Sequence, residues 1–399
     1  MEKFINSPSN VADRAQRVPF VSSRSVDAIA RELKKKGVDV LSLSGAPWQL
    51  PPEHILQAAR DATKENVHPP SQGIPELREA ISMRLEKESR MKIDPETEIL
   101  VTNGGMQALY VIFTGLINPG EEVLIPSPCF FFNGIIELVG GIPRYCPSEE
   151  DNNFAWDIGK LEKLVSSKTK ILVVNTPVNP TGYVATKEDL TQIARIAKKH
   201  NILLISDEAY DKQVYDGYKH YSVGSLPGMK ERTLTVKSFT KSYAIPTWRV
   251  GYIVGNKDII KQLRKIHEWM VLCCNYVAQK AATAALTGPQ GWVEDIRHDF
   301  ENNRNFVYAA ISKIPGISCV KSKGGPYIFL NISGLNMGPE ECSKYLLREF
   351  GIPAESGSYF QSKSHVRIPF GGADETLHKF VDRLKVAIDK YLRKSGSIS

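Results

Sequence analysis

The sequence predicts an α/β protein in which a mainly parallel sheet, flanked by helices, forms a large domain beside a smaller α+β domain. Three observations lead to this fold class. Short apolar runs alternate with helical patterns through residues 50–290, which is typical of α/β folds. The runs are apolar throughout, as in strands that are buried on both faces. After about residue 290, long helical stretches take over and the pattern of the large sheet ends.

The predicted elements follow one another in a regular order along the chain. Apolar runs typical of buried strands occur at 98–101, 123–125, 171–174, 202–205, 233–236 and 250–254. A shorter strand-like run at 326–330 follows in the C-terminal region, and helical patterns occur at 106–116, 187–200, 293–311, 339–349 and 374–394. We therefore expect a large domain over 50–290 and a small domain over 291–399. Residues 1–49 are expected to pack against the small domain.

Composition and charge exclude several classes of function. The 399 residues are 42% hydrophobic and 24% charged, which is ordinary for a globular protein. The net charge of +7 is mild, and basic clusters lie at the ends of helical patterns, so we expect no binding to nucleic acid. The six cysteines show no metal-ligand spacing, which predicts no metal site and favours a reducing compartment. Without an apolar signal or membrane-spanning run, we expect a cytoplasmic protein that does not insert into a membrane.

Polar residues with unusual chemistry follow several of the predicted strands. Ligands of parallel α/β sheets bind beyond the carboxyl ends of the strands, so these positions are candidates for a site. Asp207 either caps a helix or faces a bound cation, and Lys241 is either solvated or an imine-forming nucleophile. The turn at Gly104 and Gly105 is either a tight connection or a site where a helix N-terminus binds an anion. Asn179 lies in a turn that is rich in proline and asparagine.

Taken together, these motifs resemble the fold-type I pyridoxal-phosphate enzymes, specifically the class I/II aminotransferase family. Asn-Pro-Thr-Gly at 179–182, Ser-Asp-Glu-Ala-Tyr at 206–210 and Ser-Phe-Thr-Lys at 238–241, with Arg249 after them, form a specific combination. The resemblance spans about residues 40–370. It implies pyridoxal 5'-phosphate as cofactor and a homodimer whose subunits share their active sites.

The resemblance also implies a role for each matching residue in binding the cofactor. Lys241 would form an imine with the cofactor and shuttle a proton at the substrate α-carbon. Asp207 would pair with the pyridine nitrogen, while Asn179 and Tyr210 would donate hydrogen bonds to the ring oxygen. Four residues would bind the phosphate, namely Gly105, Met106, Ser238 and Arg249. The side chain of Phe130 would stack on the face of the cofactor ring.

The substrate contacts implied by the family involve three further positions. Arg367, in His-Val-Arg-Ile-Pro, would clamp the substrate carboxylate with two hydrogen bonds. Gly45 would contribute a backbone contact to the same carboxylate, and Asn179 would lie beside it. Lys241, Asp207 and Tyr210 are thus the predicted catalytic residues.

The sequence departs from the family pattern in three places. His68 stands where a tyrosine commonly reaches the cofactor phosphate of the partner subunit, and we expect an altered contact there. Thr247 replaces a glycine. The segment 269–276 is apolar where many relatives are polar, which favours either core packing or a substrate with an uncharged or aromatic side chain.

The sequence therefore predicts a homodimeric transaminase of amino-acid metabolism. It would move an amino group from an L-amino acid to a 2-oxo acid in ping-pong fashion. The same fold also hosts β-eliminating carbon–sulfur lyases, cyclising synthases and decarboxylases, and these alternatives stay open because all of them need the same lysine and aspartate. A cofactor-binding transcriptional regulator is disfavoured, because too few residues precede the resemblance to form a DNA-binding domain.

Overall fold

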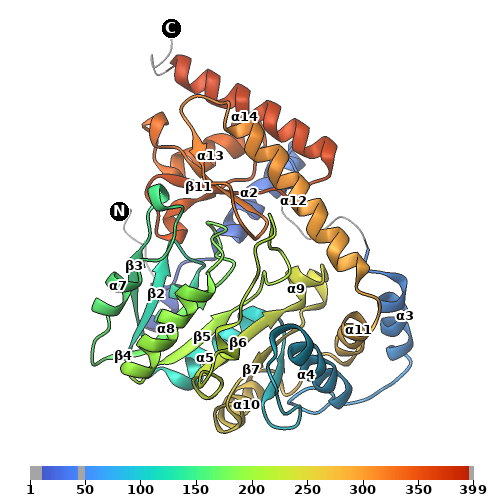
Figure 1. The fold of residues 1–399 in the computed structure, drawn as a ribbon. Helices are drawn as coiled ribbons and strands as arrows, with labels where there is room; N and C mark the ends of the chain where they lie inside the picture. The colour runs from blue at the N-terminus through green and yellow to red at the C-terminus, as the bar shows by residue number, and fades with distance from the viewer. Residues whose placement is uncertain (1–10, 44–49, 395–399) are drawn as a thin grey trace.

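The large sheet of the protein has seven strands, and six of them run in the same direction. The computed structural model describes residues 11–43 and 50–394 (Figure 1). The strand order is β1-β7-β6-β5-β4-β2-β3. Within this sheet, β7 runs opposite to the other six strands, so the sheet is mixed and mainly parallel. The bounds are β1 Ile99–Thr102, β2 Glu122–Ser127, β3 Ile142–Pro147, β4 Thr169–Asn175, β5 Leu203–Asp207, β6 Thr233–Ser238 and β7 Gly251–Val254.

Both faces of this sheet are covered, which explains why its strands are apolar throughout. Alternate side chains of one strand point to opposite faces. In β4, Ile171 and Val173 pack with the apolar side chains of α5 (Gly105–Leu116) and α10 (Lys257–Val271). Leu172 and Val174 pack on the other face with α7 (Ile158–Lys163) and α8 (Lys187–Lys199).

The β1 edge of the large sheet has its own helical cover. Side chains of β1 and β7 share a core with α3 (Glu53–Ala62), α4 (Pro75–Ser89) and α11 (Tyr276–Thr287). At the opposite edge, β3 was not predicted from the sequence. Its residues alternate between more exposed and more buried positions, as expected for an edge strand, so it lacks the continuous apolar run of the inner strands.

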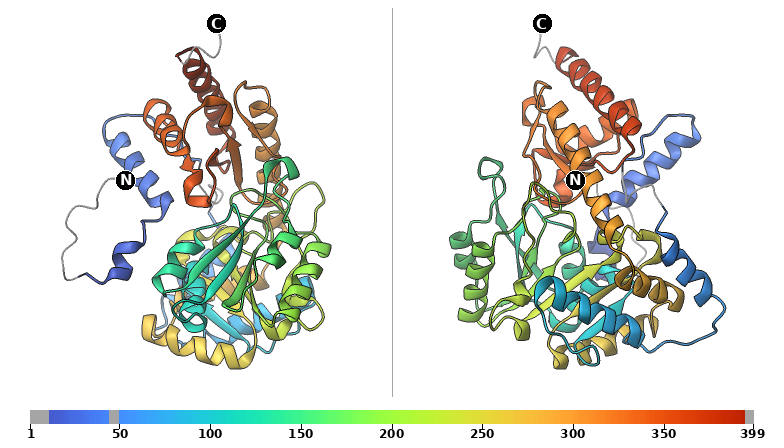
Figure 2. Two further views of the ribbon diagram at one scale, coloured as in Figure 1. Left: turned by 90° about the vertical axis from the view of Figure 1, so that its left-hand side faces the viewer. Right: turned by 45° about the vertical axis from the view of Figure 1, so that its right-hand side comes forward.

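A second sheet of four antiparallel strands, in the order β10-β11-β9-β8, forms the smaller part of the molecule. Its strands are β8 Ser318–Cys319, β9 Tyr327–Asn331, β10 Glu355–Ser356 and β11 His365–Pro369. Three helices share its apolar core, namely α12 Gly291–Ile311, α13 Pro339–Phe350 and α14 Asp374–Lys394. Leu41 and Leu43 from the N-terminal region belong to the same core. In both views of Figure 2, the helix α2 (Ser22–Lys35) lies beside this part of the molecule.

The short helical segments complete the chain between these elements. They are α1 Asp13–Arg17, α6 Phe132–Leu138, α9 Phe239–Ser242, η1 Glu150–Asn152, η2 Val223–Ser225, η3 Lys230–Arg232, η4 Pro246–Trp248, η5 Ser333–Leu335 and η6 Gly357–Phe360. None of the helices in the described part of the chain is long and apolar enough to cross a membrane.

A buried arginine ties the long helix α12 to the loop that follows β5. The side chain of Arg304 is fully buried, and its two terminal nitrogens donate to the two carboxylate oxygens of Asp216 at 2.8 Å each. It also donates to the carbonyl of Ser322 at 2.7 Å and lies over the ring of Tyr215. This bidentate pair joins segments that are far apart in the sequence.

We predict that Arg304→Met destabilises the protein by about 3 kcal/mol, because it removes a fully buried guanidinium together with its three hydrogen bonds to Asp216 and Ser322. The measurement is the free energy of unfolding in urea. Arg297→Met on the same helix is the matched control, since Arg297 pairs with Glu294 and Glu301 nearer the surface and its loss is expected to cost less than about 1 kcal/mol. Equal losses in the two variants would contradict the prediction.

Candidate active site

A cavity of about 410 Å3 lies where the carboxyl ends of the central strands of the large sheet meet the small sheet. It collects most of the residues that the sequence singled out. The predicted residues that line it are Gly105, Met106, Phe130, Asn179, Asp207, Tyr210, Ser238, Lys241, Arg249 and Arg367. Gly45 lies outside the described residues. His68 is exposed and does not line the cavity of its own chain.

The strand directions explain why residues distant in sequence meet here. Asp207 is the last residue of β5 and Ser238 the last of β6, and these strands are parallel. The strand β7 is antiparallel, so it starts at the edge where the others end. Arg249 lies just before β7 and therefore reaches the same edge as Asp207 and Ser238, which lie at the ends of their strands.

One end of the cavity is built to receive an anion. The helix α5 begins at Gly105 without a side-chain cap, so its first N–H groups are free of intrahelical partners. Arg249 lies beside this helix start, because a Cβ added at Gly104 would lie 2.4 Å from its Nη2 atom. Gly104 also has φ +78°, a conformation that favours glycine. Free amides, a positive helix end and a guanidinium fit a phosphate group.

The middle of the cavity holds a buried carboxylate that lacks a cationic partner. Burial raises the pKa of Asp207 to about 7, with a further contribution from the charge of the adjacent Glu208, while a hydrogen bond from the Ala209 amide opposes the rise. That amide lies 3.2 Å from the carboxylate. No ion pair to Asp207 occurs within the described part of the chain. A cationic heterocycle in the cavity would supply the missing charge.

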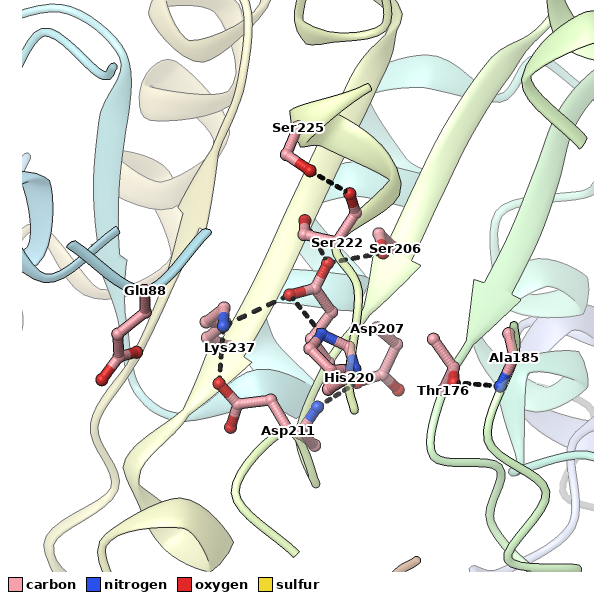
Figure 3. Close-up of polar contacts among 12 residues, drawn as sticks. Glu88, Thr176, Ala185, Ser206, Asp207, Asp211, His220, Ser222, Ser225 and Lys237 are labelled. Atoms are coloured by element: carbon pink, nitrogen blue, oxygen red, sulfur yellow. Dashed lines mark hydrogen bonds and ion pairs between the residues drawn. The ribbon is translucent and has the colours of Figure 1, made fainter. Parts of the chain in front are cut away.

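Near Asp207, the carboxylates of Glu208 and Asp211 form a buried network of charged contacts (Figure 3). Lys237 contacts Glu208 at 3.2 Å and Asp211 at 2.6 Å, and His220 contacts Glu208 at 3.1 Å. Although burial alone would raise it, Lys237 and His220 lower the pKa of Glu208 to about 2. The buried lysine is therefore committed to Glu208 and Asp211, and it is not a partner of Asp207.

Lys241 lies in the short helix α9 (Phe239–Ser242), directly after β6. Two hydrogen bonds hold this end of the helix in place. The carbonyl of Lys241 accepts a hydrogen bond from Gln213 at 3.3 Å, and the next residue, Ser242, donates to Asp211 at 2.6 Å. Through Ser242 and Asp211, the position of Lys241 is thus linked to the buried network of charges beside Asp207. Burial raises the pKa of Tyr327, but the nearby charges of Lys241 and Arg367 outweigh this and lower it.

A chain of hydrogen bonds connects the two sheets across the cavity. Asn179 donates to the hydroxyl of Tyr210 at 3.3 Å, and that hydroxyl lies 3.2 Å from the hydroxyl of Tyr327. Arg367 from the small sheet donates through Nη1 to Asn179 at 2.6 Å and through Nη2 to Glu355. Tyr327 and Glu355 were not among the site residues predicted from the sequence, because Tyr327 was predicted only as part of a strand-like run and Glu355 lay in no predicted element.

Aromatic side chains form another part of the cavity wall. Phe130 lines the cavity, and its ring centroid lies 4.8 Å from that of Phe131. The ring of Phe131 in turn faces the guanidinium of Arg367. A planar ring held beside Phe130 would bury its face against an aromatic side chain.

His68 lies on the exposed side of the molecule near the end of α10. Its Nε2 atom is 3.9 Å from the sulfur of Cys273. A second hollow lies between this region and the cavity and is lined by Thr247, Trp248, Arg249 and Asn275, among others. Arg249 lines both hollows, so the end of the cavity near the start of α5 borders this second hollow.

Comparisons with known proteins agree on one family. The family described as aminotransferase class I and II matches residues 39–384. An aspartate aminotransferase of Pyrococcus abyssi is 37% identical over 391 residues, covering 96% of this chain and 99% of the relative. The aromatic-amino-acid aminotransferase 2 of Thermococcus litoralis is 35% identical, with coverage of 96% and 99%. The solved structure of the Thermus thermophilus aspartate aminotransferase with maleate has a TM-score of 0.90 at 32% identity, covering 94% of this chain and 99% of that one.

The unpaired burial of Asp207 predicts a pH dependence in the protein without cofactor. Its folded-state pKa of about 7 exceeds the ordinary value of 3.8, so the folded state binds more protons between these values and loses stability as the pH rises through them. Asp207→Asn has no such loss. At pH 8 we expect the variant to be more stable than the parent by up to about 4 kcal/mol, and at pH 4 to be nearly equal to it.

The measurement is the free energy of unfolding in urea at pH 4, 6 and 8. Asp382→Asn, an exposed carboxylate on α14, is the matched control and should follow the parent at every pH. If Asp207→Asn also follows the parent, the carboxylate is satisfied by the protein itself.

Proposed function

Because the chain belongs to the class I and II aminotransferase family, we propose that the cavity at the carboxyl edge of the large sheet is its active site, with Lys241 as the anchor of the cofactor. The protein is a pyridoxal-phosphate-dependent aminotransferase that acts on an amino acid and a 2-oxo acid. The observation that carries the assignment of the site is the buried carboxylate of Asp207. It lies in one cavity with Lys241 and the uncapped start of α5.

The residues of this cavity suit pyridoxal 5'-phosphate at each of its polar groups. The amides of Gly105 and Met106, with Ser238 and Arg249, would hold the phosphate. Asp207 would pair with the protonated ring nitrogen. When bound, the cofactor supplies a carbonyl carbon that reacts with amines and a ring that withdraws electrons from the substrate α-carbon.

The ring would also be held on its oxygen and its face. Asn179 and Tyr210 already share a hydrogen bond and would both reach the ring oxygen. Phe130 would cover one face of the ring and exclude water from it. These contacts orient the cofactor without any movement of the strands.

Lys241 has two tasks in this proposal. Its amine would hold the cofactor covalently, and as a free amine it would carry a proton at the substrate α-carbon. The hydrogen bond from Gln213 to the carbonyl of Lys241 and the one from the Ser242 hydroxyl to Asp211 support a fixed origin for this side chain. The reaction would proceed in ping-pong fashion, the amino donor leaving as an oxo acid before the acceptor binds.

The substrate would be held by its carboxylate on Arg367. This guanidinium is buried in the cavity, and Asn179 fixes its orientation through Nη1. Gly45 is proposed as a further contact from the family pattern. The aromatic side chains around the cavity support an L-amino acid with an uncharged or aromatic side chain, and one of the relatives is named an aromatic-amino-acid aminotransferase.

A second copy of the chain is proposed to complete the site. Apolar side chains are exposed at the end of α10, where Trp269 is 92% and Leu272 is 63% exposed. They lie near His68, on the side where the second hollow borders the cavity. A homodimer formed through this face would bury the apolar side chains and would bring His68 of the partner subunit to the phosphate.

We also propose how the chain is divided into domains and in which compartment of the cell it lies. The shared core of Leu41 and Leu43 with α12, α13 and α14 supports a small domain of residues 291–399 joined by residues 1–49, with a large domain over 50–290. The six cysteines are free thiols, as in a protein of the reducing cytoplasm.

We predict that Lys241→Ala lowers the transamination rate on the order of 10^3-fold or more, because the covalent anchor and the proton carrier are lost together. Borohydride reduction followed by peptide mass analysis should attach the cofactor to the parent peptide that contains Lys241 and to no peptide of the variant. Lys257→Ala, an exposed lysine at the start of α10, should behave like the parent. A reduced lysine adduct in Lys241→Ala would contradict the assignment.

We also predict that Trp269→Glu shifts the protein from dimer to monomer at micromolar concentration, because the glutamate would be buried without a partner in the interface. Sedimentation velocity measures the change. Val386→Glu introduces the same charge at an exposed apolar position of α14 and should leave the dimer intact. A parent protein that is monomeric, or a Trp269→Glu variant that stays dimeric, would refute the proposed face.

A further inference from the structure

The arginine proposed to bind the substrate carboxylate already has a carboxylate partner within the protein. Glu355 in β10 lies directly opposite Arg367 in β11, and Nη2 of the arginine donates to its carboxylate. Both side chains are almost fully buried, at 5% exposure for Arg367 and 9% for Glu355. Both also line the cavity. A substrate carboxylate that approaches the guanidinium therefore meets a second negative charge.

The surroundings of the guanidinium limit where a ligand can attach. The ring of Tyr327 lies 4.1 Å and that of Phe360 4.5 Å from its central carbon. These rings make cation–π contacts with the guanidinium, but they accept no conventional hydrogen bond from its N–H groups. A carboxylate must use the N–H groups at the edge of the guanidinium, where Nη1 serves Asn179 and Nη2 serves Glu355.

Nε of Arg367 is buried and has no hydrogen-bond partner among the described residues. Arg367 thus keeps donor capacity while it is paired, since a guanidinium carries five N–H groups. A ligand carboxylate can join the arginine or displace Glu355 from it. In both cases two carboxylates share one cation in a site of low dielectric, and their repulsion weakens the binding of the ligand.

We propose that Glu355 is a specificity-determining residue, an internal carboxylate that competes with the substrate for Arg367 and disfavours ligands carrying a second carboxylate. The proposal rests on the role of Arg367 given above as the binding group for the substrate carboxylate. With Glu355 in place, the pair is neutral before any ligand arrives. A monocarboxylate adds one negative charge to the cavity, whereas a dicarboxylate adds two.

A purely structural pair would behave in the opposite way. If Glu355 only held Arg367 in position, its replacement would loosen the guanidinium and weaken the binding of every carboxylate. Competition and positioning therefore predict opposite signs for one measurement, which is the change in dissociation constant when the charge of Glu355 is removed.

The test uses the cofactor-loaded enzyme and two carboxylates that have no amino group and cannot react, 3-phenylpropionate and succinate. Their dissociation constants are measured by isothermal titration calorimetry for the parent and for Glu355→Gln, which keeps the size of the side chain. We expect the dissociation constant to fall about tenfold for 3-phenylpropionate and further for succinate. Binding that weakens, or that changes less than threefold for either ligand, overturns the proposal. Equal gains for the two ligands overturn its claim about dicarboxylates.

Two further variants make the result specific. Glu150→Gln removes another partly buried carboxylate, which contacts His365 on the same strand but does not line the cavity, and should change neither constant. Glu355→Ala repeats the loss of charge if the glutamine variant folds poorly, and a thermal melt and the cofactor absorbance check both proteins. The same gain is expected from it.

The double variant Glu355→Gln/Arg367→Gln separates this proposal from the one on which it rests. It removes both charges of the buried pair, so neither is left without the other, and its fold should be kept. We expect it to lose carboxylate binding at least tenfold relative to Glu355→Gln. If it binds as tightly as Glu355→Gln, then Arg367 is not the carboxylate site and the proposed function of Arg367 fails. If it loses binding while Glu355→Gln gains none, only the inference about Glu355 fails.

Discussion

The site depends on one electrostatic constraint, which is that the carboxylate of Asp207 is buried at the end of β5 without a cationic partner in the part of the chain that the structure describes. Burial of an unpaired charge is costly, and the group keeps its proton up to about pH 7 instead. The buried cation Lys237 pairs with Glu208 and Asp211 instead. The fold thus places a carboxylate where only a bound cationic ring can complete its pairing, and the rest of the cavity is arranged around that position.

The sheet explains why the start of α5, the lysine and this carboxylate meet at one edge. The neighbours β5 and β6 are parallel and deliver Asp207 and Ser238 to one edge, and Lys241 follows one helical turn later. The hydrogen bond between Arg367 and Asn179 then connects this edge to the small sheet. Arg367 is proposed to bind the substrate and Asn179 to bind the cofactor ring. Because they share a hydrogen bond, a displacement of one side chain would alter the position of the other.

Much of this arrangement could be predicted from the sequence, because it follows from local patterns. The inner strands are apolar on both faces, and the residues after them form compact motifs such as Ser-Phe-Thr-Lys at 238–241. The misses have a common physical cause. The edge strand β3 alternates in burial and lacks an apolar run, and the direction of β7 depends on tertiary pairing. The contact between Glu355 and Arg367 depends on the register of two short strands, which no local pattern specifies.

The reversal of β7 also limits how this chain can vary in length. Ser238 at the end of β6 pairs with Gly251 at the start of β7, so the connection between them is closed at both ends by the ladder. Lys241 and Arg249 both lie within it, one near each end. An insertion or deletion there would shift the lysine relative to the arginine, and a shift in the strands would break the pairing. Related chains should therefore keep the length of this connection constant while its composition changes, as the threonine at position 247 already illustrates.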